Sequence, residues 1–257
     1  MAHILPSGTA SLALFWLVLG RSSGVVATAP LLSSSSLPGQ VRAILAVIVA
    51  VVALPAAAAG QGPLPSAVLP LVFGVAEQVV VGLLLGLMAQ IVFSVAQIAG
   101  GALDVQLGFS IAQEVDPLYG QPISLLSNWF NLLASLAYLA AGGLEVLVGA
   151  VTLSFQHLSL SAPLPVGATT QALLSAVTWA FGLALTLALP VMAVSLALSL
   201  VLGLIGRIVP QFNVLQSVLP AQTLVSTAVL LLVTPMLVSS FTQLVPATLA
   251  RLGGVLP

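Results

Sequence analysis

"ALLSAVTWAFGLALTLALPVMAVSLALSLVLGLIG", residues 172–206, is the stretch that decides the fold class, because it contains no charged side chain. A helix that crosses a membrane needs about 20 mainly apolar residues, since its backbone groups must pair within the segment. At about 1.5 Å per residue, a helix over this stretch exceeds roughly 50 Å, well beyond a hydrocarbon core of about 30 Å. Pro190, near its middle, removes one backbone hydrogen bond. We therefore expect a kinked helix or a helical hairpin here.

The whole chain shares this apolar character. Of its 257 residues, 60% are hydrophobic and 4% are charged, whereas a soluble domain carries about 25% charged residues. A soluble protein of this composition would expose large apolar patches and aggregate. The formal net charge of −1 provides no basic surface for nucleic acid, and the lack of cysteine excludes disulfides and thiolate metal sites. The composition indicates an integral membrane protein.

Six apolar segments are predicted to be helices, and they are separated by stretches rich in Pro, Gly and Ser. The segments are residues 4–20, 41–59, 68–99, 123–153, 172–206 and 218–246. Pro and Gly mark the connections because Pro lacks a backbone N–H and Gly tolerates positive φ. We expect an all-α, polytopic membrane-type protein with kinked helices or helical hairpins, forming one domain over residues 1–257.

Two of these segments carry a regular row of polar or small residues. In the segment 123–153, steps of four and three alternate through Ser124, Asn128, Asn131, Ser135, Tyr138, Gly142, Glu145, Gly149 and Thr152. The end of the preceding segment repeats these steps with Gln90, Ser94, Gln97, Gly101 and Asp104. Such spacing places each row on one helix face. Amides and carboxylates cost free energy in hydrocarbon, so both faces are predicted to meet a lumen, a cavity or another subunit. Ordinary helix packing is the alternative for the Ser and Gly positions.

The few acidic residues raise a second hypothesis. Three of the five lie within residues 104–116, and the other two, Glu77 and Glu145, lie in predicted helices. Acids within a membrane are typical of proton or cation sites, so a small secondary transporter using Glu77, Asp104 and Glu145 is a rival function. Such transporters are often built from internal repeats, and none is visible. A structural scaffold is a third hypothesis, but it would not need a polar helix face.

The one sequence match to a catalytic motif lacks the secondary structure and the partner residue that the motif requires. "GRSSG", residues 20–24, matches the G-x-S-x-G pattern, but it follows an apolar segment, whereas the motif needs a strand–turn–helix elbow and an assisting His. Nucleotide-binding and zinc-protease motifs are absent from the sequence. We predict a protein that is not an enzyme, without catalytic, cofactor-binding or metal-binding residues.

Two blocks carry motifs that resemble the FliR family of flagellar export-gate proteins, whose counterparts serve virulence-type secretion. The first, residues 96–140, is "AQIAGGALDVQLGFSIAQEVDPLYGQPISLLSNWFNLLASLAYLA". It is similar to the family's Q-x-A-G, Q-M-G-F-x-I-A and D-P followed by a polar-faced helix, with Leu107 where methionine is usual. The second, residues 203–220, is "GLIGRIVPQFNVLQSVLP" and resembles G-x-x-x-R-x-x-P-Q-x-N-x-F followed by proline, with Leu215 in place of the aromatic residue. A Gly-His pair common in the family appears here as Gly143-Leu144-Glu145, so no role of that His is carried over.

The resemblance implies a core subunit of the flagellar type III export gate. It implies assembly with FliP-like and FliQ-like partners into a channel for unfolded flagellar proteins, with FlhB and FlhA nearby. It places the chain in the bacterial inner membrane as a multi-pass component of the flagellar basal body, with much of the assembly clear of the lipid. The form "QLGFSIAQEVDP" favours the flagellar branch, and the equivalent subunit of a virulence system is the alternative.

The resemblance also implies roles for particular residues. A plug-like loop at about 108–120 would project into the lumen, with Gly108, Phe109, Ile111, Glu114, Asp116, Pro117 and Gly120. Its acids would remain hydrated, while Phe109 and Ile111 could form an apolar constriction against ions. A structural loop between the last two segments would contain Arg207, Pro210, Gln211 and Asn213.

Other positions are predicted to contact a lumen or a neighbouring subunit. The polar ones are Gln97, Asp104, Asn128, Asn131, Tyr138 and Glu145. Gly82 and Gly86 form a G-x-x-x-G helix-contact motif, for which general helix packing is the first interpretation. Close packing against partners can also use Gly82, Gly86, Gly203 and Gly206.

Overall fold

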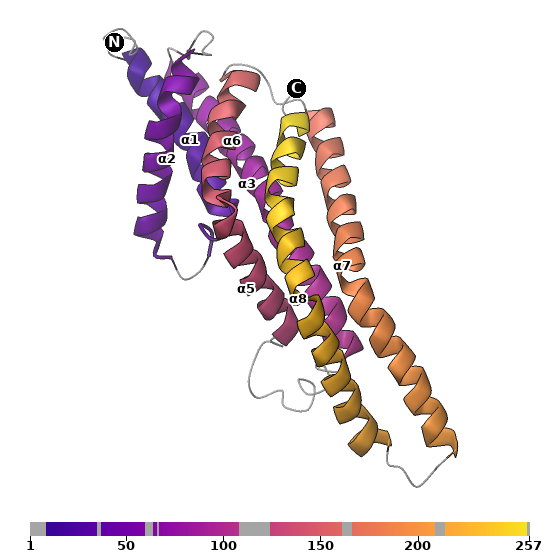
Figure 1. Ribbon diagram of the computed structural model, residues 1–257. Helices are drawn as coiled ribbons and strands as arrows, with labels where there is room; N and C mark the ends of the chain where they lie inside the picture. The colour runs from indigo at the N-terminus through magenta and orange to yellow at the C-terminus, as the bar shows by residue number, and fades with distance from the viewer. Residues whose placement is uncertain are drawn as a thin grey trace. The chain divides into compact units, whose positions relative to one another are not determined.

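The structure, a computed structural model, describes residues 9–34, 37–59, 64–65, 67–107, 124–160, 166–208 and 214–255. These residues form helices without a strand (Figure 1). The helices are α1 (Thr9–Thr28), α2 (Gly39–Ala59), α3 (Val68–Gln106), α5 (Leu125–Ala140), α6 (Gly143–His157), α7 (Val166–Ile208) and α8 (Val214–Val255). Among the described residues, five helices are long and apolar enough to cross a membrane, and the number of spans rises to six if α5 and α6 count as one broken span. The predicted all-α, membrane-type fold is confirmed.

Three helices are much longer than a membrane is thick. α3, α7 and α8 have 39, 43 and 42 residues, so each is roughly 60 Å long at about 1.5 Å per residue. A hydrocarbon core of about 30 Å can hold only about half of such a helix. α7 continues through Pro190 as one helix, so a hairpin within residues 172–206 is excluded.

The polar segment 123–153 is not one helix. It breaks after Ala140, and Gly142 has a φ of 69°, a left-handed conformation that glycine adopts readily. Ser124 to Tyr138 therefore precede the break, whereas Glu145, Gly149 and Thr152 belong to α6. The single nine-residue face predicted from the spacing is wrong, because the spacing continues across a break that the backbone makes.

The chain divides into two compact units, and each unit takes part of α3, α7 and α8. Unit 1 is Met1–Ile91, Leu139–Val177 and Leu244–Pro257, and unit 2 is Val92–Tyr138 and Thr178–Gln243. The single domain over residues 1–257 stays a prediction.

In unit 1, α1 lies against α3 at backbone distance. A methyl group added at Gly82 would overlap the carbonyl oxygen of Arg21, and one added at Gly86 would overlap the hydroxyl of Thr28. Gly24 of α1 meets the carbonyl of Val79 in the same way. Gly82 and Gly86 therefore pack against α1 inside the chain, as the helix-contact interpretation predicts, and not against a partner subunit. Gly203, in contrast, has open space beside it.

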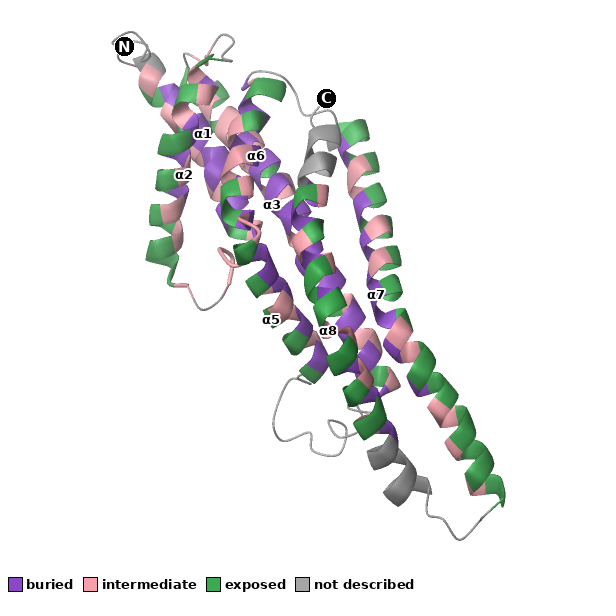
Figure 2. Cartoon of the chain, in the orientation of Figure 1, coloured by how far each residue is buried: buried purple, intermediate pink, exposed green. Residues whose placement is uncertain are grey.

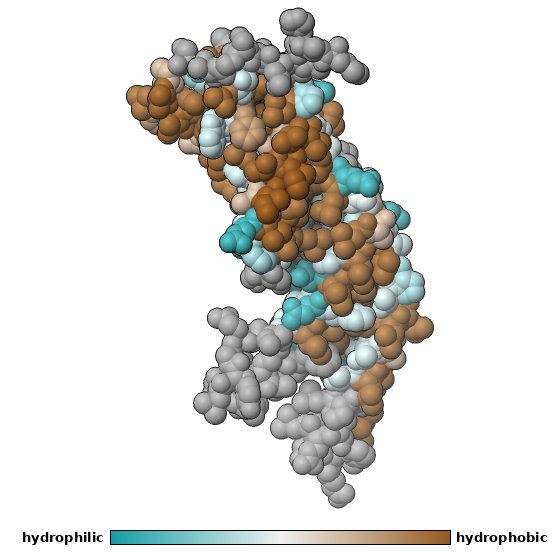
Figure 3. All heavy atoms as spheres, turned by 90° about the vertical axis from the view of Figure 1, so that its left-hand side faces the viewer, coloured by the Kyte–Doolittle hydropathy of each residue, from teal (hydrophilic) through white to brown (hydrophobic). Residues whose placement is uncertain are grey.

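α2 has small residues on its inner face and large apolar residues on its outer face (Figure 2). Ala46, Ala50, Ala53 and Ala57 are buried, whereas Ile44, Val47, Ile48, Val51 and Val52 are exposed. Small residues let helices approach closely in membrane proteins, where the outer surface is as apolar as lipid. Figure 3 views the molecule from the side on which α2 lies in Figure 1. Hydrophobic side chains cover most of the described part of this surface.

The core of unit 2 is aromatic and alanine-rich. Phe93 of α3 and Tyr138 of α5 pack edge to face at 5.6 Å between ring centroids, and Phe130 meets Phe241 of α8 at 6.3 Å. Ala134 lies between these positions on α5 and is fully buried. These contacts hold α5 against α3 and α8, and so place the N-terminal end of α5 beside the C-terminal end of α3.

Candidate functional site

A buried arginine joins three helices of unit 1. Arg21 lies in the middle of α1 and is completely buried. Its Nε and Nη2 donate to Oε1 of Gln78 on α3 at 2.8 and 2.5 Å, and its Nη1 donates to Oγ of Ser154 on α6 at 2.9 Å. Nη2 also donates to the carbonyl of Leu158 at 3.2 Å, and the guanidinium carbon lies 4.0 Å from the centroid of the Phe155 ring. We call these five residues the Arg21 cluster.

Among the described residues, Arg21 donates only to neutral oxygen atoms. These are the side-chain amide oxygen of Gln78, the hydroxyl of Ser154 and the backbone carbonyl of Leu158. A buried cation is costly unless its N–H groups are paired, and here four hydrogen bonds and a ring face replace water. Ser154 completes the network by donating its own hydroxyl to the carbonyl of Val151 at 2.6 Å. The arrangement fixes the positions of the three helices, and the hydroxyl of Ser154 is engaged on both sides, as an acceptor from Arg21 and as a donor to Val151.

Sequence reasoning missed this cluster. It ended the first segment at residue 20 and treated "GRSSG" as the start of a connection, whereas α1 runs through it to Thr28. Ser22 is buried within the same helix, which rules out a strand–turn–helix elbow. The sequence does contain an indication that the helix continues past residue 20. Mainly apolar residues follow Gly24 as "VVATA", residues 25–29.

Asp104 belongs to α3, and its side chain reaches the beginning of α5 in unit 2. Its carboxylate is buried and accepts hydrogen bonds from the hydroxyl of Ser124 and from the backbone N–H of Leu126. Asp104 was predicted to contact a lumen or a subunit, but the structure places it inside the unit. Tyr138 is also buried, with its ring on Phe93. Neither side chain presents a polar surface outward in this chain.

The other predicted polar positions are more accessible. Gln97 on α3 and Asn128 on α5 are exposed, and Asn131 is half-buried. The two helices are in contact here, since the hydroxyl of Ser127 donates to the backbone carbonyl of Gln97 at 3.1 Å. Glu145 is exposed on α6 and belongs to unit 1. The predicted lumen- or subunit-contacting surface stays a prediction.

The predicted loops fall largely outside the described residues. All seven residues of the plug-like loop, Gly108, Phe109, Ile111, Glu114, Asp116, Pro117 and Gly120, lie there. Of the predicted structural loop, Arg207 is described and is exposed near the end of α7, whereas Pro210, Gln211 and Asn213 lie outside. Both loop assignments stay predictions.

The acids of the rival transporter hypothesis do not form a described site. Glu77 is half-buried on α3 in unit 1, with Glu145 in the same unit and Asp104 in unit 2. Among the described residues, three or more His, Asp or Glu side chains are not grouped so that they could hold a metal ion.

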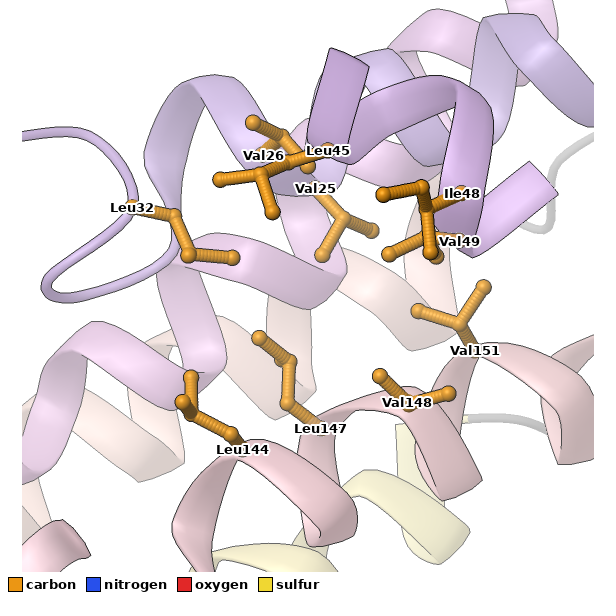
Figure 4. Close-up of a pocket in the computed structure, with 10 residues that line it drawn as sticks. All are labelled: Val25, Val26, Leu32, Leu45, Ile48, Val49, Leu144, Leu147, Val148 and Val151. Atoms are coloured by element: carbon orange, nitrogen blue, oxygen red, sulfur yellow. The ribbon is translucent and has the colours of Figure 1, made fainter. Parts of the chain in front are cut away.

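An apolar cavity of about 180 Å³ lies within unit 1. Figure 4 shows Val25 and Val26 of α1 facing Leu147 and Val148 of α6 across it, with α2 alongside. The complete lining is Val25, Val26, Leu32, Leu45, Ile48, Val49, Leu144, Leu147, Val148 and Val151. Its wall is made of aliphatic side chains, and its volume is below the roughly 300 Å³ at which ligand pockets begin. This cavity has no group that would bind a polar solute.

Comparison with known proteins extends over most of the chain. The family model described as bacterial export proteins, family 1, matches residues 12–247. The chain is 30% identical to the flagellar biosynthetic protein FliR of Escherichia coli over 78% of its length and 76% of that protein. It is 25% identical to the FliR of Caulobacter vibrioides, over 84% and 86% of the two chains. It is also 30% identical to the surface presentation of antigens protein SpaR of Salmonella typhimurium, over 79% and 76%.

Proposed function

Since the chain belongs to the bacterial export proteins, family 1, we propose that it is a core subunit of a flagellar type III protein export gate. The single observation that carries this proposal is the family match over residues 12–247, which includes both sequence blocks, all of α3 and α7, and most of α8. The similarity to FliR proteins of several bacteria supports the flagellar assignment. The chain acts by lining and holding a channel, without catalytic chemistry.

The fold supports a subunit that needs partners. α7 and α8 expose large side chains such as Phe181, Leu200, Leu224 and Leu232 along their length. Helices of roughly 60 Å extend well past a hydrocarbon core of about 30 Å, so part of this apolar surface lies outside lipid and requires another protein. FliP-like and FliQ-like subunits are the proposed partners, with FlhB and FlhA nearby. The inner membrane and the flagellar basal body are the proposed location.

The exposed polar residues are assigned to the channel side. Gln97 lies on α3 and Asn128 on α5, next to Ser127, whose hydroxyl donates to the backbone carbonyl of Gln97, and the segment 108–120 follows α3 in the chain. Hydrophobic constrictions block ions by dewetting, so Phe109 and Ile111 are proposed as the plug. Unfolded flagellar proteins would pass once the channel opens.

The equivalent subunit of a virulence secretion system is the second candidate. The observation that favours it is the 30% identity to SpaR, which equals the identity to the FliR of Escherichia coli. The form of the block around residues 106–117 favours the flagellar one.

The test removes the gene from its host and measures protein secretion. We expect filament and hook proteins to disappear from the medium and motility to be lost, and a plasmid copy to restore both. Loss of virulence effectors with normal motility would assign the chain to the other system. Normal secretion of both classes would contradict the proposed function.

A further inference from the structure

The apolar cavity of unit 1 lies among α1, α2 and α6, and Leu32 adds to its wall from the turn between α1 and α2 (Figure 4). The side chains of this wall are aliphatic throughout. An engineered cavity of about 150 Å³ with such a wall stays dry and binds benzene, because water finds no hydrogen-bond partner in it. At about 180 Å³, the cavity of unit 1 has room for an apolar group of comparable size.

The mouth of the cavity lies between α2 and α6. Ile48 of α2 and Leu144 of α6 belong to the wall and are 52% and 37% exposed, whereas Val25, Leu147 and Val151 in the same wall are buried. The cavity therefore leads from the surface into the interior of the unit. Ile48 also belongs to the outer face of α2, whose exposed large side chains are all aliphatic. A surface of this composition is suited to hydrocarbon, so the mouth opens where lipid chains are expected.

Arg42 indicates the depth of this mouth in a membrane. It lies in the first turn of α2, whose 21 residues are long and apolar enough to cross a membrane. A cation at the end of such a helix is placed at the level of the lipid headgroups, because its burial in hydrocarbon is costly. Leu45 and Ile48 follow three and six residues later, which is roughly 5–9 Å further along the helix. The mouth therefore lies at the depth where the acyl chains begin.

The turn beside the cavity is strained. Leu31 has a φ of 64°, a left-handed conformation that costs free energy in a residue with a Cβ atom. Strain of this kind persists only where surrounding contacts hold it, and it gathers at ligand sites. The next residue, Leu32, is half-buried and forms part of the cavity wall. An occupant of the cavity would pack against Leu32 and so help to hold this turn.

We propose that the cavity binds part of an acyl chain of a membrane lipid, which enters between Ile48 and Leu144. The inference rests on the membrane location proposed above and goes beyond the export function. The volume is smaller than that of pockets for whole drug-sized molecules, and it suits a segment of a chain whose remainder stays in the bilayer. The aliphatic wall selects hydrocarbon, and the headgroup of the lipid stays outside the cavity.

A photoactivatable fatty acid tests the inference in intact cells. Cells that express the full chain incorporate a fatty acid with a diazirine in its hydrocarbon chain into their lipids. After irradiation, the lipid adducts on the isolated protein are mapped by mass spectrometry. We expect adducts on the buried cavity residues Val25, Leu147 and Val151, in addition to those on lipid-facing residues. Adducts confined to exposed residues such as Ile44 and Val51 would overturn the proposal, and so would a complete lack of adducts.

A matched pair of variants separates the cavity from the outer surface. Val148 points into the cavity (Figure 4), so Val148→Phe should fill it and remove the adducts on Val25 and Leu147, while those on Ile44 remain. Val51→Phe makes the same exchange on the exposed face of α2 and should keep the buried adducts. Buried adducts that persist in Val148→Phe would contradict the assigned site. If Val148→Phe fails to accumulate, the adduct map of the unmodified chain decides the question.

Secretion measured in the same cells separates this inference from the proposed function. Buried adducts in a chain whose removal leaves secretion normal would contradict the export function and leave the lipid site standing. Loss of secretion on removal, with adducts on the exposed residues alone, would overturn only the lipid site.

Discussion

Two nitrogens of the Arg21 guanidinium, Nε and Nη2, donate to the same side-chain oxygen of Gln78 and so join α1 to α3, with N–O distances of 2.8 and 2.5 Å. The two residues are 57 positions apart and both are buried. The same guanidinium reaches Ser154 and Leu158 on and after α6, so one side chain sets the mutual position of three helices. Its geometry leads to the first prediction.

Arg21→Leu is expected to destabilise unit 1 by about 1–3 kcal/mol for each buried acceptor left unsatisfied. Arg21→Lys should rescue little, because one ammonium group cannot replace the planar fork that bonds Gln78 twice and Ser154 once. Thermal unfolding of the purified complex in detergent measures both effects. Arg42→Lys is the control, and it should change the unfolding temperature little. Full rescue by lysine would show that charge alone, and not geometry, is needed at position 21.

Gly82→Ala should separate α1 from α3, because the added methyl group would overlap the carbonyl oxygen of Arg21. Overpacking of this kind costs about 1–3 kcal/mol. Gly182→Ala in α7 is the matched control, since nothing lies within 4 Å of a methyl group there, and in a helix alanine is favoured over glycine by about 1 kcal/mol. Unfolding in denaturant compares the two variants. Equal stability of both would contradict the close α1–α3 contact.

Deletion of residues 109–119 is expected to leave an assembled but leaky complex, because the helices remain and the apolar plug is lost. Permeability to ions and small solutes, measured by growth under osmotic and solute stress, reports the leak. Unchanged permeability in a normally assembled complex would refute the plug assignment.

Arg207→Ala should lower the yield of assembled complex more than it lowers export by each complex that forms. The residue lies at the exposed end of α7, next to the predicted structural loop. Its donors can pair carbonyl groups that a membrane-buried connection must satisfy. Quantified complex yield and secretion per complex separate the two effects. Normal yield with abolished export would place Arg207 on the path of the exported protein.

The helices were predictable because the backbone groups of a long apolar segment in lipid must pair within that segment, which a helix achieves. The break at Gly142 was not, because a spacing of three and four residues continues across it and a positive φ at one glycine leaves no periodic trace. The sequence left a kinked helix and a hairpin open for residues 172–206, and the structure has one helix, since an interior proline removes one hydrogen bond and need not end a membrane helix.

The site was less predictable than the fold because its contacts are distant in the sequence. Arg21 pairs with residues 57 and 133 positions away, so a local pattern could only suggest the end of a segment. Asp104 lies on the predicted polar face, but its partner is the beginning of α5, 20 residues on. Periodicity identifies a face as polar, and only the fold shows whether that face meets water or another helix.

The most direct measurement of the central claim is the mass of the complex that forms with its proposed partners. The chain is expressed alone and together with FliP-like and FliQ-like proteins, and each preparation is purified in detergent and weighed by light scattering or native mass spectrometry. We expect the chain alone to be unstable or aggregated, because its apolar surface lacks cover, and the co-expressed chain to run in one larger, monodisperse complex. A stable monomer or homodimer that purifies alone and transports solutes in liposomes would contradict the export-gate account.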